Sequence, residues 1–147
     1  MKIYNARYLD NNQRFIVAII TGFIAAILFG SLYGLITSFI HVSFSVMFVA
    51  VGYGVASVIK HFGKGVHTRF MVVGAIMTTF AIFLGDMMSV YSVPRFASLL
   101  LSGNFSFIGI FFVAWLRSMA SADVSGILSL AFRLIGIYIG YMQSVIL

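Results

Sequence analysis

The chain has 147 residues, of which 62% are hydrophobic and only 8% are charged, and its mean hydropathy is +1.12. Because soluble domains carry roughly 25% charged residues, this composition excludes a water-soluble globular protein and predicts a membrane protein. The net charge of +6 would suggest nucleic acid as the partner of a soluble protein. Here the basic residues flank apolar runs, which favours the lipid bilayer and its anionic lipids as partners and argues against nucleic acid. The absence of cysteine excludes disulfides, thiolate metal sites and thiol catalysis.

Three apolar runs approach or exceed the ~20 residues that a helix needs to cross the hydrocarbon core of a bilayer. Residues 15–36 and 42–59 carry no charge, and residues 70–91 carry one, at Asp86. Each run is predicted to be helical, because lipid offers no hydrogen-bond partner to backbone N–H and C=O groups. Residues 37–41 are expected to form a tight connection. The polar segment before residue 15 and the length of the following run argue against a cleavable signal sequence, so the first run is expected to remain as a span.

Basic residues define the expected orientation. Six of them lie before the first span or between the second and third, at Lys2, Arg7, Arg14, Lys60, Lys64 and Arg69. The 37–41 connection has neither lysine nor arginine. The positive-inside rule therefore predicts that the N-terminus and the loop around residue 64 are cytoplasmic. The basic residues of this loop are also candidate contacts for anionic lipid headgroups.

The last third of the sequence allows two topologies. Pro94 suits the first turn of a new helix, and the apolar run 96–117 is interrupted by polar residues at 102–104. In the first interpretation residues 94–123 are interfacial or broken helix, and 127–146 is a fourth span with the C-terminus inside. In the second, residues 96–117 form a fifth span, which places Arg117 in the cytoplasm and the C-terminus outside. The polar break favours the first. We therefore predict an all-α, polytopic transmembrane helix bundle of four spans, in a single domain over residues 1–147.

Small residues recur every four positions in two of the apolar runs. They are Gly22, Ala26, Gly30 and Gly34 in the first span and Gly136 and Gly140 in the last. Such strips lie on one helix face and allow backbones to approach closely in a membrane. The pattern predicts packing inside the chain, with a homodimer face as the alternative.

Asp86 and Arg133 are the charges expected within the spans. A charge deep in the bilayer costs ~2.5–3.5 kcal/mol on insertion scales, which favours pairing. We therefore expect the two side chains to face each other as an intramembrane ion pair. The first interpretation is structural: the pair is a packing salt bridge, or Arg133 instead extends to a membrane interface. The alternatives are a proton or ion pathway and an anionic headgroup site at Arg133. Tyr33, Tyr91, Trp115 and Tyr138 are expected to anchor the helices at the interface.

Catalytic, metal and cofactor motifs are not evident. The loop histidines His61 and His67 are six residues apart with no carboxylate nearby, so they are expected to be solvated rather than metal ligands. The glycines around Lys64 lack the remaining residues of a phosphate-binding loop. No nucleophile, base and acid are recognisable as a set. We therefore expect no enzymatic activity, no metal and no cofactor.

Three short motifs resemble a family of small, uncharacterised bacterial polytopic inner-membrane proteins of unknown function. The glycine-rich segment 51–60 is followed by a Gly-Lys-Gly turn at 63–65, residues 84–89 read Leu-Gly-Asp-Met-Met-Ser, and residues 135–141 read Gly-Ile-Tyr-Ile-Gly-Tyr after an isoleucine. The chain departs from the family in having Asp86 where asparagine is usual, a more apolar segment at 96–115 and no basic C-terminal tail. The resemblance implies about four spans with an outer interfacial segment, and implies no activity.

The sequence therefore favours a non-enzymatic accessory, scaffold or assembly subunit of the bacterial inner membrane that acts through helix packing. It would associate with itself or with another membrane protein. The alternative is a small oligomeric transporter or channel with Asp86 and Arg133 in the pathway.

Overall fold

The computed structural model describes residues 10–40, 45–120 and 123–146, and these residues contain six α-helices and no strand. The helices are α1 (Asn11–Ile40), α2 (Met47–Gly63), α3 (Thr68–Tyr91), α4 (Val93–Leu101), α5 (Ser106–Met119) and α6 (Val124–Gln143). The all-α class predicted from the sequence is therefore confirmed for the described residues.

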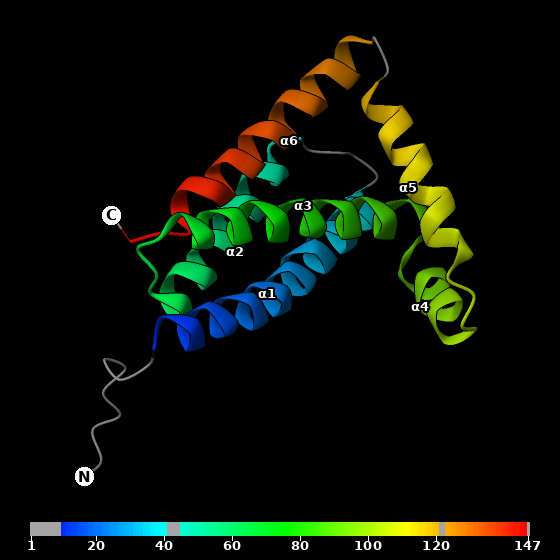
Figure 1. Cartoon of the computed structure of the whole chain (residues 1–147). Helices are drawn as coiled ribbons and strands as arrows, with labels where there is room; N and C mark the ends of the chain where they lie inside the picture. Colours follow the sequence, from blue (N-terminus) through cyan, green and yellow to red (C-terminus); the bar gives the residue numbers. More distant parts are fainter. Residues whose placement is uncertain (1–9, 41–44, 121–122, 147) are drawn as a thin grey trace.

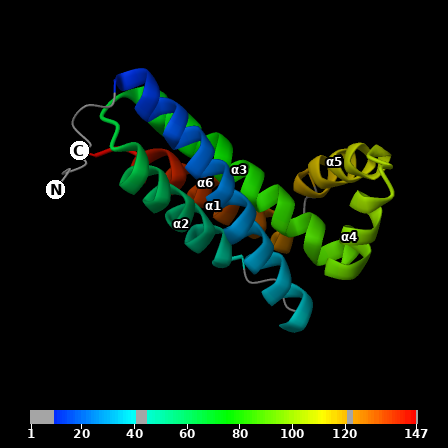
Figure 2. The same cartoon turned by 90° about the horizontal axis from the view of Figure 1, so that it is seen from below.

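Four of the helices pack together, and the two shortest stand at one end of them. α1 packs against α3 and α2, and α6 packs against α2 and α3. Figures 1 and 2 show α4 and α5 beyond the end of α3, with α5 running back toward the start of α6. α6 approaches the other helices at its C-terminal end and diverges from α3 toward its N-terminal end (Figure 1).

The beginning of α1, the α2–α3 turn and the end of α6 lie at the same end of the molecule (Figure 1). The rings of Phe15 in α1 and Phe70 in α3 are 5.7 Å apart, edge to face. The backbone N–H of Ile146, just beyond α6, donates a hydrogen bond of 3.1 Å to the carbonyl of Gly65 in the turn. Both contacts hold the two ends of the described chain beside the same turn.

Among the described residues, three helices are long and apolar enough to cross a membrane: α1 with 30 residues, α3 with 24 and α6 with 20. At about 1.5 Å per residue, α3 is about 36 Å long and α6 about 30 Å, similar to a hydrocarbon core of ~30 Å. α2 and α5 are apolar but shorter, with 17 and 14 residues.

The helix boundaries correct several predicted ones. α1 extends beyond 15–36 at both ends, so the prediction that residues 37–40 form a connection is wrong; His41 lies outside the described residues. α2 begins at Met47, five residues after the predicted start at 42, and continues past the predicted end at 59. Residues 42–44 lie outside the described residues. Lys60 and His61 do not end it, because basic side chains suit the negative end of the helix dipole. The helix predicted at 70–91 starts at Thr68, and the one predicted at 127–146 is Val124–Gln143.

The segment predicted as interfacial or broken helix at 94–123 is two separate helices. α4 has Pro94 in its first turn, where the missing N–H costs nothing. The chain leaves α4 through Gly103, whose φ of +70° is accessible to glycine at little cost, and α5 follows. Asp123 then precedes the first residue of α6.

The burial pattern of α1 places small residues inside and large ones outside. Ala18, Gly22, Ala26 and Gly30 are buried, whereas Ile24 and Leu28 are more than half exposed. In water-soluble proteins, the large apolar side chains are the ones most often buried. The outer face of α1 therefore suits a surrounding medium of hydrocarbon.

Close helix contacts depend on glycine at several positions. A Cβ built on Gly30 would lie 2.7 Å from the carbonyl oxygen of Ala81 in α3. A Cβ on Gly136 would lie 2.5 Å from the carbonyl oxygen of Phe48 in α2. Since atoms this close must shift, and here the neighbours are backbone, glycine fixes both the α1–α3 and the α2–α6 separations.

Candidate functional site: a buried ion pair beside two cavities

Asp86 of α3 and Arg133 of α6 form an ion pair. Nη2 of Arg133 donates a hydrogen bond of 2.8 Å to Oδ2 of Asp86, and only 12% and 11% of the two side chains are exposed. The structure thus brings together the two residues that the sequence singled out. Asp86 lies in the last turns of α3, and Arg133 is the tenth residue of the 20-residue α6.

The carboxylate of Asp86 has two further donors. Nε1 of Trp115 in α5 donates a hydrogen bond of 2.8 Å to Oδ2, the same oxygen that accepts from Arg133. The hydroxyl of Tyr33 in α1 donates a longer bond of 3.4 Å to Oδ1. Hydrogen bonds to an ionised group are stronger than neutral ones, so these donors offset part of the cost of burying the charge.

The guanidinium of Arg133 lies over two aromatic rings. Its Cζ is 5.0 Å from the ring centroid of Phe48 in α2 and 5.8 Å from that of Trp115. A cation over an aromatic face is stabilised by the ring quadrupole, and more strongly when water is absent. The Nε of Arg133 is buried and has no hydrogen-bond acceptor.

Five helices meet at this cluster. Tyr33, Phe48, Asp86, Trp115 and Arg133 come in turn from α1, α2, α3, α5 and α6. Because Trp115 and Arg133 both donate to Asp86 of α3, the cluster ties α5 and α6 to the rest of the bundle. We name these five residues the charge cluster.

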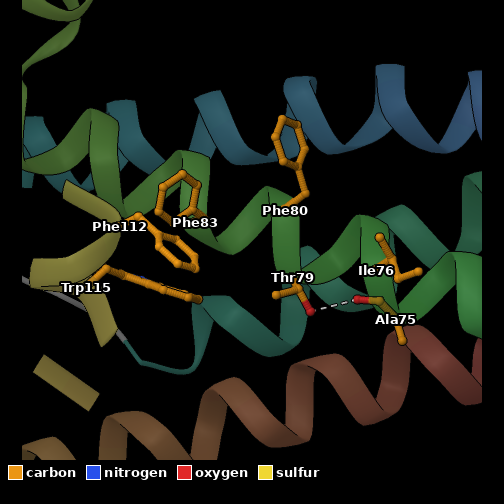
Figure 3. A pocket seen from close by; sticks show the side chains of 7 residues that line it. All are labelled: Ala75, Ile76, Thr79, Phe80, Phe83, Phe112 and Trp115. Carbon is orange, nitrogen blue, oxygen red and sulfur yellow. Dashed lines mark hydrogen bonds between the residues drawn. The ribbon is translucent and has the colours of Figure 1, made fainter. Parts of the chain in front are cut away.

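A cavity of about 440 Å³ reaches the charge cluster between α3, α5 and α6. Asp86, Trp115 and Arg133 line it together with Ser89, Tyr91 and Ser118. Trp115 also lines a second cavity of about 490 Å³. Figure 3 shows its wall, in which Trp115 and Phe112 of α5 approach Phe83 of α3, while Phe80, Thr79, Ile76 and Ala75 follow along α3.

The sequence analysis missed the contribution of aromatic residues to this site. Tyr33 and Trp115 were expected to anchor the helices at a membrane interface, but they are only 2% and 8% exposed and both donate to Asp86. The structure places both side chains inside the bundle as partners of Asp86. The available signal was that a buried tyrosine or tryptophan needs a polar partner, and Asp86 is the acidic residue within the apolar runs.

The strips of small residues lie inside the chain. Gly22, Ala26, Gly30, Gly34, Gly136 and Gly140 are all buried. A Cβ on Gly22 would approach Ile59 of α2 and Met77 of α3, and one on Gly34 would approach Met88 of α3. Gly140 faces Thr78 and Gly74 of α3. These faces are therefore occupied by neighbouring helices, and the alternative in which the strip forms a homodimer face is wrong.

The basic residues of the 60s region lie at the end of the molecule opposite α4 (Figure 2). Lys60 is in the last turn of α2, Lys64 follows α2 with a left-handed φ of 45°, and Arg69 is in the first turn of α3. Lys64 and Arg69 are exposed. The structure leaves these two available to solvent or lipid headgroups.

No family model, curated protein or solved structure matches this chain. The resemblance to small bacterial inner-membrane proteins therefore stays a prediction. Within the described ranges, no three His, Cys, Asp or Glu side chains gather where they could hold a metal ion.

Proposed function

We propose that this chain is a multi-pass protein of the bacterial cytoplasmic membrane with four spans, α1, α2, α3 and α6, and a cytoplasmic N-terminus. The small residues of α1 are buried and its large apolar residues are exposed, which supports hydrocarbon as the medium around this helix. Lys60, Lys64 and Arg69 lie at or beside the α2–α3 turn, and this turn is at the same end of the molecule as the start of α1 and the end of α6 (Figure 1). Four crossings return the chain to the side from which it started, in agreement with the bond between Ile146 and Gly65.

In this topology α4 and α5 lie toward the outer side. At 9 and 14 residues they extend about 14 Å and 21 Å, so neither is long enough to cross alone. α2 has 17 residues, which is the lower limit for a span. The alternative of five spans would require α4 and α5 to cross as one broken element.

Cysteine labelling tests this placement, because the natural chain has no cysteine. We expect Asn104→Cys, in the exposed α4–α5 connection, to react with a membrane-impermeant maleimide added to intact cells. We expect Lys64→Cys, which is also exposed, to react only after the membrane is permeabilised. Labelling of Lys64→Cys but not Asn104→Cys in intact cells would contradict the proposed orientation.

The proposed role is that of a non-enzymatic accessory, scaffold or assembly subunit. The observation that carries it is the exposure of α6, in which only Gly136 and Gly140 are buried. The side chains of Leu134 and Tyr138 in this helix are 58% and 62% exposed. The charge cluster satisfies its charges within the chain, while the apolar face of α6 remains open to another transmembrane helix.

A co-purification experiment tests this role. We expect a stoichiometric membrane partner to be retained in mild detergent by the natural chain and lost by Leu134→Ala. Leu28→Ala on α1 is the matched control, because Leu28 is 57% exposed, and it should retain the partner. Equal retention by both variants, or no partner at all, would contradict a subunit role for α6.

The second candidate is a small oligomeric transporter or channel. The cavity that reaches Asp86 and Arg133 favours it, because charges within a membrane frequently line ion or substrate pathways. The same purified protein, reconstituted into liposomes, separates the two roles. We expect no flux from an accessory subunit, whereas a measurable flux from the natural chain would favour transport.

A further inference from the structure

The cavity beside the charge cluster offers hydrogen-bond donors that the chain does not use. The guanidinium of Arg133 has several N–H donors, and the structure gives it one hydrogen-bond acceptor, Asp86. Arg133 and Trp115 both line the cavity of about 440 Å³, which is within the volume range of small-molecule sites. An oxygen acceptor entering this cavity would therefore meet a cation with donors to spare.

The charge balance of the site selects the kind of acceptor. Asp86 already neutralises Arg133 at a distance of 2.8 Å. An incoming carboxylate or phosphate would bring a second negative charge beside Asp86, in a setting where repulsion is weakly screened. A neutral carbonyl oxygen would accept from Arg133 without this penalty, so the site favours an ester carbonyl over an anionic headgroup.

The position of the site along α3 agrees with this choice. Asp86 precedes the last residue of α3, Tyr91, by five positions, or about 7–8 Å along the helix. α3 is about 36 Å long, so if it is centred in a hydrocarbon core of ~30 Å, each of its ends protrudes by about 3 Å. Asp86 then lies a few ångströms inside the hydrocarbon boundary. This is deeper than headgroup phosphates and close to the acyl esters of a glycerolipid.

The second cavity provides a place for a hydrocarbon chain. Trp115 lines both this cavity and the first. Its other lining side chains, drawn in Figure 3, come from α3 and α5 and are apolar or aromatic apart from Thr79, and Ile76 among them is 59% exposed. A chain lying along α3 could thus enter from the surrounding hydrocarbon and end beside the charge cluster.

We propose that these two cavities bind one acyl chain of a glycerolipid, with its ester carbonyl accepting a hydrogen bond from Arg133 and its hydrocarbon lying between α3 and α5 past Trp115. This site rests on the membrane placement proposed above. It assigns to α5 the role of holding a bound lipid against α3.

Quenching of tryptophan fluorescence tests the site, because Trp115 is the single tryptophan of the chain. The purified, delipidated protein in detergent is titrated with a phosphatidylcholine whose acyl chains are brominated, since bromine quenches an indole on contact. A matched brominated lipid with ether instead of ester linkages lacks the carbonyl. We expect saturable quenching by the ester lipid at a concentration about tenfold lower than by the ether lipid, the effect of losing one hydrogen bond to a charged group.

Ala114→Leu provides the variant, because Ala114 lines the cavity and a larger side chain would fill it. We expect it to weaken binding of the ester lipid at least tenfold with an unchanged circular dichroism spectrum. Ala131→Leu, an exposed position of α6 outside both cavities, is the matched control and should bind as the natural chain does.

Equal affinity for the ester and ether lipids, non-saturable quenching, or an unchanged affinity of Ala114→Leu would each overturn the lipid site. These failures are distinct from failure of the membrane placement. The placement would fail if the protein stayed monodisperse without detergent, whereas the lipid site can fail in a protein that requires detergent.

Discussion

Replacement of Asp86 by asparagine is expected to lower the free energy of unfolding by about 3–5 kcal/mol, the usual cost of removing one partner of a buried ion pair. The amide keeps the shape of the carboxylate and can still accept from Trp115 or Tyr33. It leaves the charge of Arg133 without a counter-charge at a position where only 12% of the side chain is exposed. The loss is therefore electrostatic rather than a loss of packing.

Denaturant unfolding of the detergent-solubilised protein, followed by circular dichroism, measures this effect. Asp123→Asn is the matched control, because Asp123 is exposed before α6 and asparagine is an equally good residue there; we expect a change within about 0.5 kcal/mol. The double variant Asp86→Asn with Arg133→Gln should recover part of the loss, because it removes the unpaired cation. If the single and double variants were equally destabilised, the charges would not be coupled as the structure indicates.

Replacement of Gly136 by alanine is expected to destabilise the protein by about 1–3 kcal/mol, as overpacking of a close contact does. The new methyl group would lie 2.5 Å from the carbonyl oxygen of Phe48, and backbone cannot rotate away as a side chain can. α6 would have to move from α2, which would also displace Arg133, three residues earlier on the same helix.

Gly109→Ala is the matched control for this substitution. Gly109 also lies inside a helix, α5, but a Cβ built on it meets no atom within 4 Å. Alanine there should stabilise the protein by roughly 0.5–1 kcal/mol, because glycine costs helix entropy. Thermal unfolding of the two variants in the same detergent gives the comparison, and a loss of stability in both would argue against a specific α2–α6 contact at Gly136.

The long helices and the glycine strips were predictable because they follow from local patterns. Long apolar runs near residues 15–36 and 70–91 specify helices in a lipid medium, and a small residue at every fourth position specifies one face. Helix ends were less predictable. α1 continues four residues past the predicted end at 36, and in this last turn the hydroxyl of Thr37 donates to the carbonyl of Tyr33.

The charge cluster was only partly predictable. Asp86 and Arg133 stand out because charge is costly in an apolar segment, so their pairing could be expected from the sequence. The participation of Trp115 depends on how α5 folds back beside α3, which is set by contacts between rings such as Phe83 with Trp115 and Tyr91 with Phe107. Aromatic residues in apolar segments carry no periodic signal for such contacts, so neither the two cavities nor the indole hydrogen bond could be derived without the structure.

The hydrogen bond between Ile146 and Gly65 has a consequence for biogenesis. In the proposed orientation, neither the start of α1 nor the end of α6 has to be translocated through the bilayer. The described segments that must be moved to the far side are the approach to α2 and the α4–α5 hairpin. Residues 45–46 and 93–119 of these segments contain two basic residues, Arg95 and Arg117, so few basic side chains have to be transferred during insertion.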